Sequence, residues 1–136
     1  MALTETGLDR RILSGVCPVR ILLAGAVQCG DPIKYSTGWK LATNESGKPA
    51  ILFAGESGDV GDYIVAYAMA VVELEHTLAN VPTMGQQLAL ADAGTYDATV
   101  AANYQDIGYI VEIDADSLHS RALVCGIIVE LDAAGV

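Results

Sequence analysis

The apolar residues of the chain fall in short runs of Val, Ile, Leu and Tyr. Clusters of Gly, Pro, Asn and Asp separate these runs about every eight to twelve residues, a spacing typical of an all-β sandwich or barrel. The pattern predicts strands at residues 19–27, 31–37, 38–43, 50–55, 62–75, 86–92, 95–100, 106–114 and 121–131. We therefore expect an all-β fold, a compact barrel-like or sandwich domain.

One segment, residues 65–80, fits two secondary structures. It is rich in Ala, Leu and Glu, which favours a helix, but from Tyr63 to Val72 larger and smaller apolar residues alternate. Alternation with a period of two is typical of a strand, and apolar residues at both phases indicate burial on both sides. We expect a strand through about Leu74, followed by a loop at residues 76–85.

The 136 residues have the length of one domain. We expect an N-terminal arm at residues 1–20 and a single β domain at residues 21–136. The DAG sequence ending at Gly94 predicts a tight hairpin between its flanking strands. The last predicted strand is apolar nearly throughout, so we expect it at the centre of the sheet or under another subunit, because an exposed apolar edge would aggregate.

The net charge of −10 and the pI of about 4.3 argue against a nucleic-acid-binding protein. Phosphate contacts need clustered Lys and Arg, and the chain has seven such residues in all. Three of them, Arg10, Arg11 and Arg20, lie in the first twenty residues. The expected arm is thus locally basic, and it could meet an acidic surface of a protein partner or simply be solvated.

The longest apolar run, residues 63–72, is far shorter than the ~20 residues that a bilayer requires. The first fifteen residues carry acids before their basic pair and lack the apolar core of a signal peptide. We expect no membrane partner and synthesis in a cytoplasm. Cys17, Cys29 and Cys125 are widely spaced and odd in number, which indicates buried free thiols.

The acids Glu112, Asp114 and Asp116 raise the question of a catalytic or metal site. They alternate with apolar residues, which would place all three on one face of a strand. Such a face could offer oxygen ligands to a hard cation such as calcium. The residues after Asp116 do not continue as a calcium-binding loop, so the pattern favours a solvated strand face.

The remaining searches for chemistry give no recognisable site. His76 and His119 lie in no motif that joins a histidine to a nucleophile or to a zinc site. The glycines of GESGDVG, at residues 55–61, have the wrong spacing for a phosphate-binding loop and indicate a turn. We therefore predict no catalytic residues, no metal, no cofactor and no enzyme activity.

The order of motifs along the chain is more informative. LLAGAVQCGDPIKY, GWKLA, the long strand leading to VVELE, the hairpin G-x-x-L-x-L-x-D-A-G-x-Y-D, DIGYIVEID and the closing ALVCGIIVEL follow one another over about residues 22–131. This order resembles the capsid decoration proteins, or cement proteins, of tailed bacteriophages.

The resemblance implies a non-enzymatic β module, often a homotrimer, on the outer capsid surface of the virion. There it would clamp neighbouring subunits of the major capsid protein. The resemblance has no motif in the arm. As a separate hypothesis, the arm reaches across a subunit boundary, with interface residues Leu8, Arg10, Arg11, Ile12, Leu13 and Arg20.

Two other functions stay open. A carbohydrate-binding β module, or another virion part such as a tail or collar protein, is the main alternative, and Trp39, Tyr96, Tyr104 and Tyr109 would form the sugar platform. An enzyme using Glu112, Asp114 or Asp116 would show a metal-dependent activity.

Overall fold

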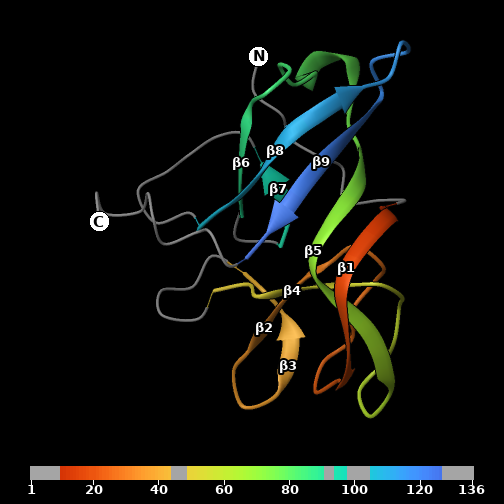
Figure 1. Ribbon diagram of the computed structural model, residues 1–136, viewed down its shortest axis with the longest axis vertical. Coiled ribbons are helices and arrows are strands. Elements are labelled where there is room, and N and C mark those ends of the chain that lie inside the picture. Colours follow the sequence, from red (N-terminus) through yellow and green to blue (C-terminus); the bar gives the residue numbers. More distant parts are fainter. Residues whose placement is uncertain (1–9, 44–48, 91–93, 98–104, 127–136) are drawn as a thin grey trace.

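The computed structural model describes residues 10–43, 49–90, 94–97 and 105–126 (Figure 1). All strands belong to one curled antiparallel sheet that forms a half-barrel, so the predicted all-β, barrel-like fold is confirmed. No helix in these ranges is long and apolar enough to cross a membrane. The elements are β1 (Arg11–Leu22), β2 (Pro32–Tyr35), β3 (Trp39–Leu41), β4 (Leu52–Ala54), β5 (Tyr63–Glu75), the 3-10 helix η1 (Leu78–Asn80), β6 (Gln87–Leu90), β7 (Tyr96–Asp97), β8 (Gln105–Ile113) and β9 (His119–Cys125).

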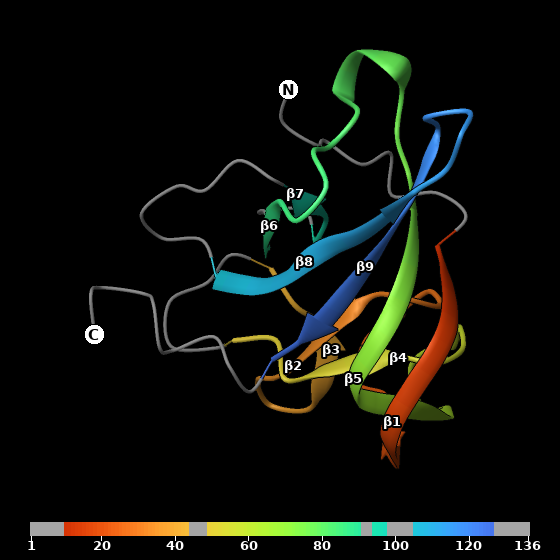
Figure 2. The ribbon, with the colours of Figure 1, turned by 45° about the horizontal axis from the view of Figure 1, so that its top comes forward.

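The long strand β5 is the centre of the sheet. Val71 lies opposite Ser14 of β1 on one side and Leu123 of β9 on the other, while Tyr67 has Pro18 of β1 and Phe53 of β4 as its neighbours. β1 therefore covers one edge of β5, and β4 and β9 share the other. From β5 the sheet continues as two branches, β4–β2–β3 and β9–β8–β6–β7, which separate as Figure 2 shows.

The described residues form two hydrophobic cores. The lower core contains Ile21, Leu23, Val27, Ile33, Leu52, Ala54, Ile64 and Ala66. The upper core contains Ala42, Ala50, Phe53, Ala70, Val72, Leu74, Leu88, Leu90, Tyr96, Ile107, Ile110, Ala122 and Val124. Strand β4 lies between the two cores, because Phe53 faces the upper core and its neighbours Leu52 and Ala54 belong to the lower one.

Strand β1 changes the expected domain boundary. Residues 11–20 were expected in an arm, but they form most of β1 and pair with β5 along their length. Pro18 argued against a strand here, because proline lacks the N–H that a central strand needs. Proline is tolerated at the edge of a sheet. Among the described residues β1 is such an edge, so its start belongs to the β domain. Residues 1–9 of the expected arm lie outside the described ranges.

Strand β5 confirms the expected strand through Leu74, but one expectation about it is wrong. Ile64, Ala66, Ala70, Val72 and Leu74 face the cores, as predicted. The other face is only partly covered: Tyr63 and Met69 are exposed and Val65 is half-buried, whereas Tyr67 packs against the upper core and Glu73 is buried. Large apolar side chains of β5 therefore contact solvent on this face.

Strand β9 lies between β5 and β8, as expected for the last apolar segment. Ala122 and Val124 point into the upper core, whereas Leu123 is exposed on the other face. A Cβ atom at Gly108 of β8 would lie 2.1 Å from the Leu123 carbonyl oxygen, so only glycine permits this close approach. Residues 127–131 of the predicted strand are outside the described ranges.

The hairpin predicted around Gly94 is confirmed. Leu90 of β6 pairs with Tyr96 of β7, and Gly94 has a φ of 76°, which favours glycine. The thiol prediction is only partly correct. All three cysteines are free, but Cys17 is exposed, Cys29 is half-buried and only Cys125 is buried, because Cys17 lies on the open strand β1.

Candidate functional site

A row of charged residues crosses four strands on the outer face of the sheet. Arg11 of β1 pairs in register with Glu73 of β5, Glu73 with Arg121 of β9, and Arg121 with Glu112 of β8. The Arg11 Nε donates to the Glu73 carboxylate at 3.0 Å, and Arg121 lies 3.4 Å from Glu73 and 2.8 Å from Glu112. We call these four residues the charged row. Within it, Arg11 and Arg121 neutralise the buried Glu73 carboxylate.

Two of the three acids singled out in the sequence, Glu112 and Asp114, contact Arg121 of this row. Asp114 accepts a hydrogen bond of 2.6 Å from Arg121, which also holds Glu112. The bond to Asp114 is the main cause that raises the pKa of Arg121 above its ordinary value. A bulge at Val111 exposes that residue, so the expected apolar side of the strand is interrupted there. The predicted solvated face is thus a surface where Arg121 neutralises two of the three acids.

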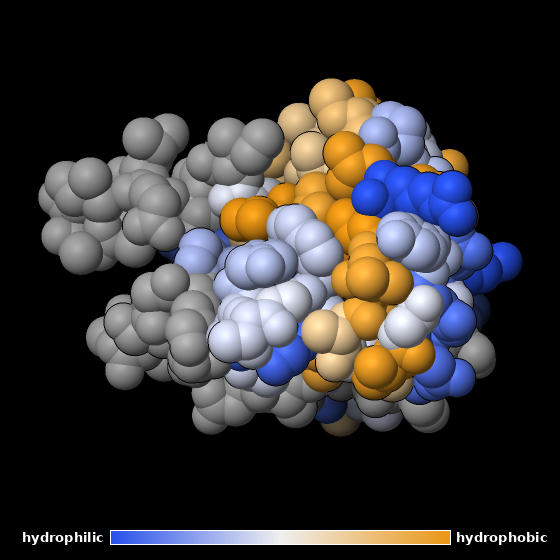
Figure 3. Space-filling model, turned by 90° about the horizontal axis from the view of Figure 1, so that it is seen from below, coloured by the Kyte–Doolittle hydropathy of each residue, from blue (hydrophilic) through white to orange (hydrophobic). Residues whose placement is uncertain are grey.

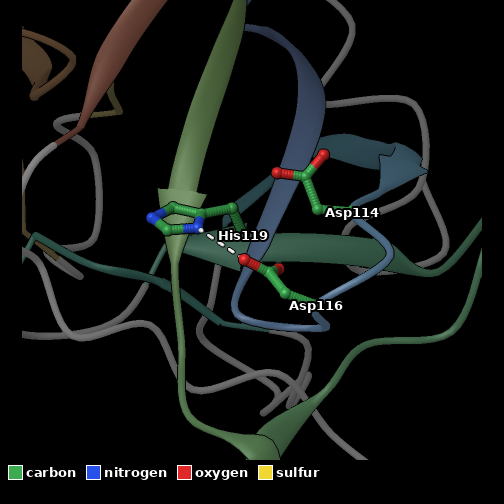
Figure 4. Close-up of side chains that lie close together, drawn as sticks. All are labelled: Asp114, Asp116 and His119. Carbon is green, nitrogen blue, oxygen red and sulfur yellow. Dashed lines mark ion pairs between the residues drawn. The ribbon is translucent and has the colours of Figure 1, made fainter.

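Asp116 joins a second group, at the turn between β8 and β9. Ligand atoms of Asp114, Asp116 and His119 lie within 4.8 Å of one another (Figure 4). The His119 ring nitrogens are 3.9 Å from Asp116 and 3.8 Å from Glu75. These side chains could supply nitrogen and oxygen ligands to a cation, but the Arg121 guanidinium already lies on Asp114 and would oppose a second positive charge.

An open cavity of about 350 Å³ adjoins the charged row. Arg10, Arg11, Glu73 and His119 line it. Each arginine in this lining is paired with a carboxylate, Arg10 with Asp31 and Arg11 with Glu73. A polar cavity whose charges are satisfied within the chain has little capacity to attract a charged small molecule.

Apolar residues occupy the rows next to the charged row on the same face. Leu123 lies opposite Val71 and Tyr109, and Met69 lies opposite Val16. Val71 is half-buried, and Val16, Met69, Tyr109 and Leu123 are exposed. We call these five residues the outer patch. Neighbouring exposed apolar residues of this kind are typical of an interaction site.

A second apolar region lies at the lower end of the molecule. Figure 3 shows a band of hydrophobic residues crossing the underside between hydrophilic areas. Leu22 of β1 and Tyr63 of β5, which pair with each other, are both exposed, as is Val60 in the preceding turn. Exposed apolar residues are therefore found along β1 and β5 and also on β8 and β9.

The predicted interface residues have different environments. Arg11 and Leu13 are exposed on β1, and the Arg20 guanidinium lies over the Tyr63 ring, 4.8 Å from its centroid. Ile12 packs against the upper core. Arg10 is buried, so the prediction that it contacts a partner at the surface is wrong. Leu8 lies outside the described residues.

Arg10 is the centre of a buried polar cluster that the sequence did not reveal. It forms an ion pair with Asp31, donates to the Gly94 carbonyl at 3.0 Å and lies 4.9 Å from the centroid of the Tyr96 ring. Tyr96 in turn donates to the Gly30 carbonyl at 2.6 Å. The desolvation caused by burial raises the pKa of Asp31, although the Gln28 amide and Arg10 lower it.

This polar cluster joins two of the motifs that carry the resemblance. The Gly-Asp pair of AGAVQCGD provides Gly30 and Asp31, and the G-x-Y-D hairpin provides Gly94 and Tyr96. A Cβ atom at Gly30, whose φ is 85°, would lie 2.8 Å from the Arg10 Cβ. The motifs therefore have a structural role: they hold the start of β1 against the turns before β2 and β7.

His76 and Ser120 form a pair that sequence analysis did not predict. The His76 Nε2 lies 2.6 Å from the Ser120 hydroxyl. Both residues are buried, and the other His76 ring nitrogen faces the Thr77 carbonyl at 3.4 Å. A serine that contacts no solvent cannot meet a substrate, so this pair joins the end of β5 to β9.

The aromatic residues proposed for sugar binding do not gather. Tyr96 is fully buried, Trp39 packs edge-on against Tyr35 on the lower branch, and Tyr109 is exposed on the upper branch. Tyr104 lies outside the described residues. Within the described part of the chain, this set therefore offers no shared stacking surface for a sugar ring.

Comparison with protein-family models, curated proteins and solved structures gave no match to this chain.

Proposed function

We propose that this chain is a virion structural protein that binds the outside of a tailed-phage capsid and stabilises it by clamping neighbouring coat subunits. The observation that carries the proposal is the outer patch, an apolar surface on the sheet next to charges that are largely neutralised within the chain. Such a surface favours protein binding over chemistry on a small substrate. The motif order that resembles decoration proteins supports the same function.

The proposed partners are the major capsid protein and two further copies of this chain. Burial of apolar area would supply the binding free energy, at about 25 cal/mol per Å² before association costs. A homotrimer follows from the resemblance, and exposed apolar residues on both the upper and lower parts of the sheet suit a module that contacts more than one neighbour. The proposed location is the outer capsid surface, after synthesis in the host cytoplasm.

The first test measures the mass of the purified protein by light scattering and then its binding to empty heads of the phage that encodes it. We expect a mass about three times 14.2 kDa and co-sedimentation with the heads. Electron microscopy of the mixture would place the added density on the capsid. Density confined to the tail or collar, or no binding to any part of the virion, would refute the decoration function.

A further inference from the structure

We draw no further inference here: the strongest candidate, the partly exposed side-chain cluster of Asp114, Asp116 and His119 at the turn between β8 and β9, has its Asp114 carboxylate already held by Arg121, and no second observation among the described residues points to a bound cation.

Discussion

The buried polar cluster and the charged row begin at neighbouring residues, yet their environments are opposite. The Arg10 side chain is 5% exposed and reaches inward to Asp31, whereas the Arg11 side chain is 68% exposed and lies along the surface on Glu73. Both arginines pair with one carboxylate. The two regions therefore compare a buried and an exposed arginine, each paired with a buried carboxylate.

The comparison shows that burial, more than charge, decides what an arginine does here. A buried pair leaves an uncompensated charge when one partner is removed, which costs several kcal/mol. At Glu73 the Arg11 side chain is hydrated and a second cation, Arg121, lies on the same carboxylate, so the loss of Arg11 costs less. We therefore expect the cluster around Arg10 to hold the fold and the charged row to shape the surface.

The largest expected effect is that of Arg10→Met. The substitution keeps an apolar side chain of similar length but leaves Asp31 buried without its ion-pair partner. We expect a loss of about 3–5 kcal/mol in the free energy of unfolding, measured by urea denaturation. The double variant Arg10→Met with Asp31→Asn should recover much of this loss, because Asn removes the buried charge and can still accept the Gln28 N–H bond. Equal stability of the two variants would contradict this account.

A smaller effect is expected for Tyr96→Phe. The change removes only the hydroxyl that donates to the Gly30 carbonyl at 2.6 Å and leaves the packing of the ring intact. Loss of a buried hydrogen bond that leaves its acceptor without this donor costs about 1–3 kcal/mol. Tyr35→Phe, at an exposed tyrosine, is the matched control and should change the free energy of unfolding by less than about 0.5 kcal/mol.

The burial of Asp31 gives this region a pH dependence whose sign can be predicted. Its pKa in the folded protein is raised above 3.8, so the folded state binds a proton more readily than the unfolded state. The contribution of Asp31 to stability is therefore full below about pH 4 and is lost as the pH rises through the folded pKa, by at most about 1.4 kcal/mol per pH unit. The difference in unfolding free energy between the wild-type protein and Asp31→Asn, followed upward from pH 4, measures it. A difference that grew in favour of the wild type with rising pH would reverse the sign.

The sequence predicted the fold class and most strands because those depend on local patterns. The turn residues around Gly94 predicted the hairpin, and the alternation of apolar residues with a period of two predicted the strand through Leu74. The start of β1 was missed because Pro18 and the exposed β1 side chains give no burial pattern. The partly covered face of β5 was missed for a related reason: apolar residues at both phases do not reveal whether a second layer exists.

The sequence predicted less of the site, because the site depends on contacts between distant residues. Arg10, Asp31 and Tyr96 are far apart in the chain, and nothing in their local sequence marks Arg10 as buried and Arg11 as exposed. Glu73 offered one usable signal. An acid that follows a long apolar run within a strand needs a cationic partner if it is buried, and the structure supplies two, Arg11 and Arg121.

The smallest expected effect is that of Arg11→Ala, the surface counterpart of Arg10→Met. Arg121 still lies 3.4 Å from the Glu73 carboxylate when Arg11 is removed, so the buried acid keeps a cationic partner. We expect a loss of no more than about 1 kcal/mol in the free energy of unfolding. The loss should shrink in about 1 M NaCl, where charges are screened beyond about 3 Å. A loss as large as that of Arg10→Met, unchanged by salt, would mean that Arg11 also acts as a buried charge and would remove the contrast between the two regions.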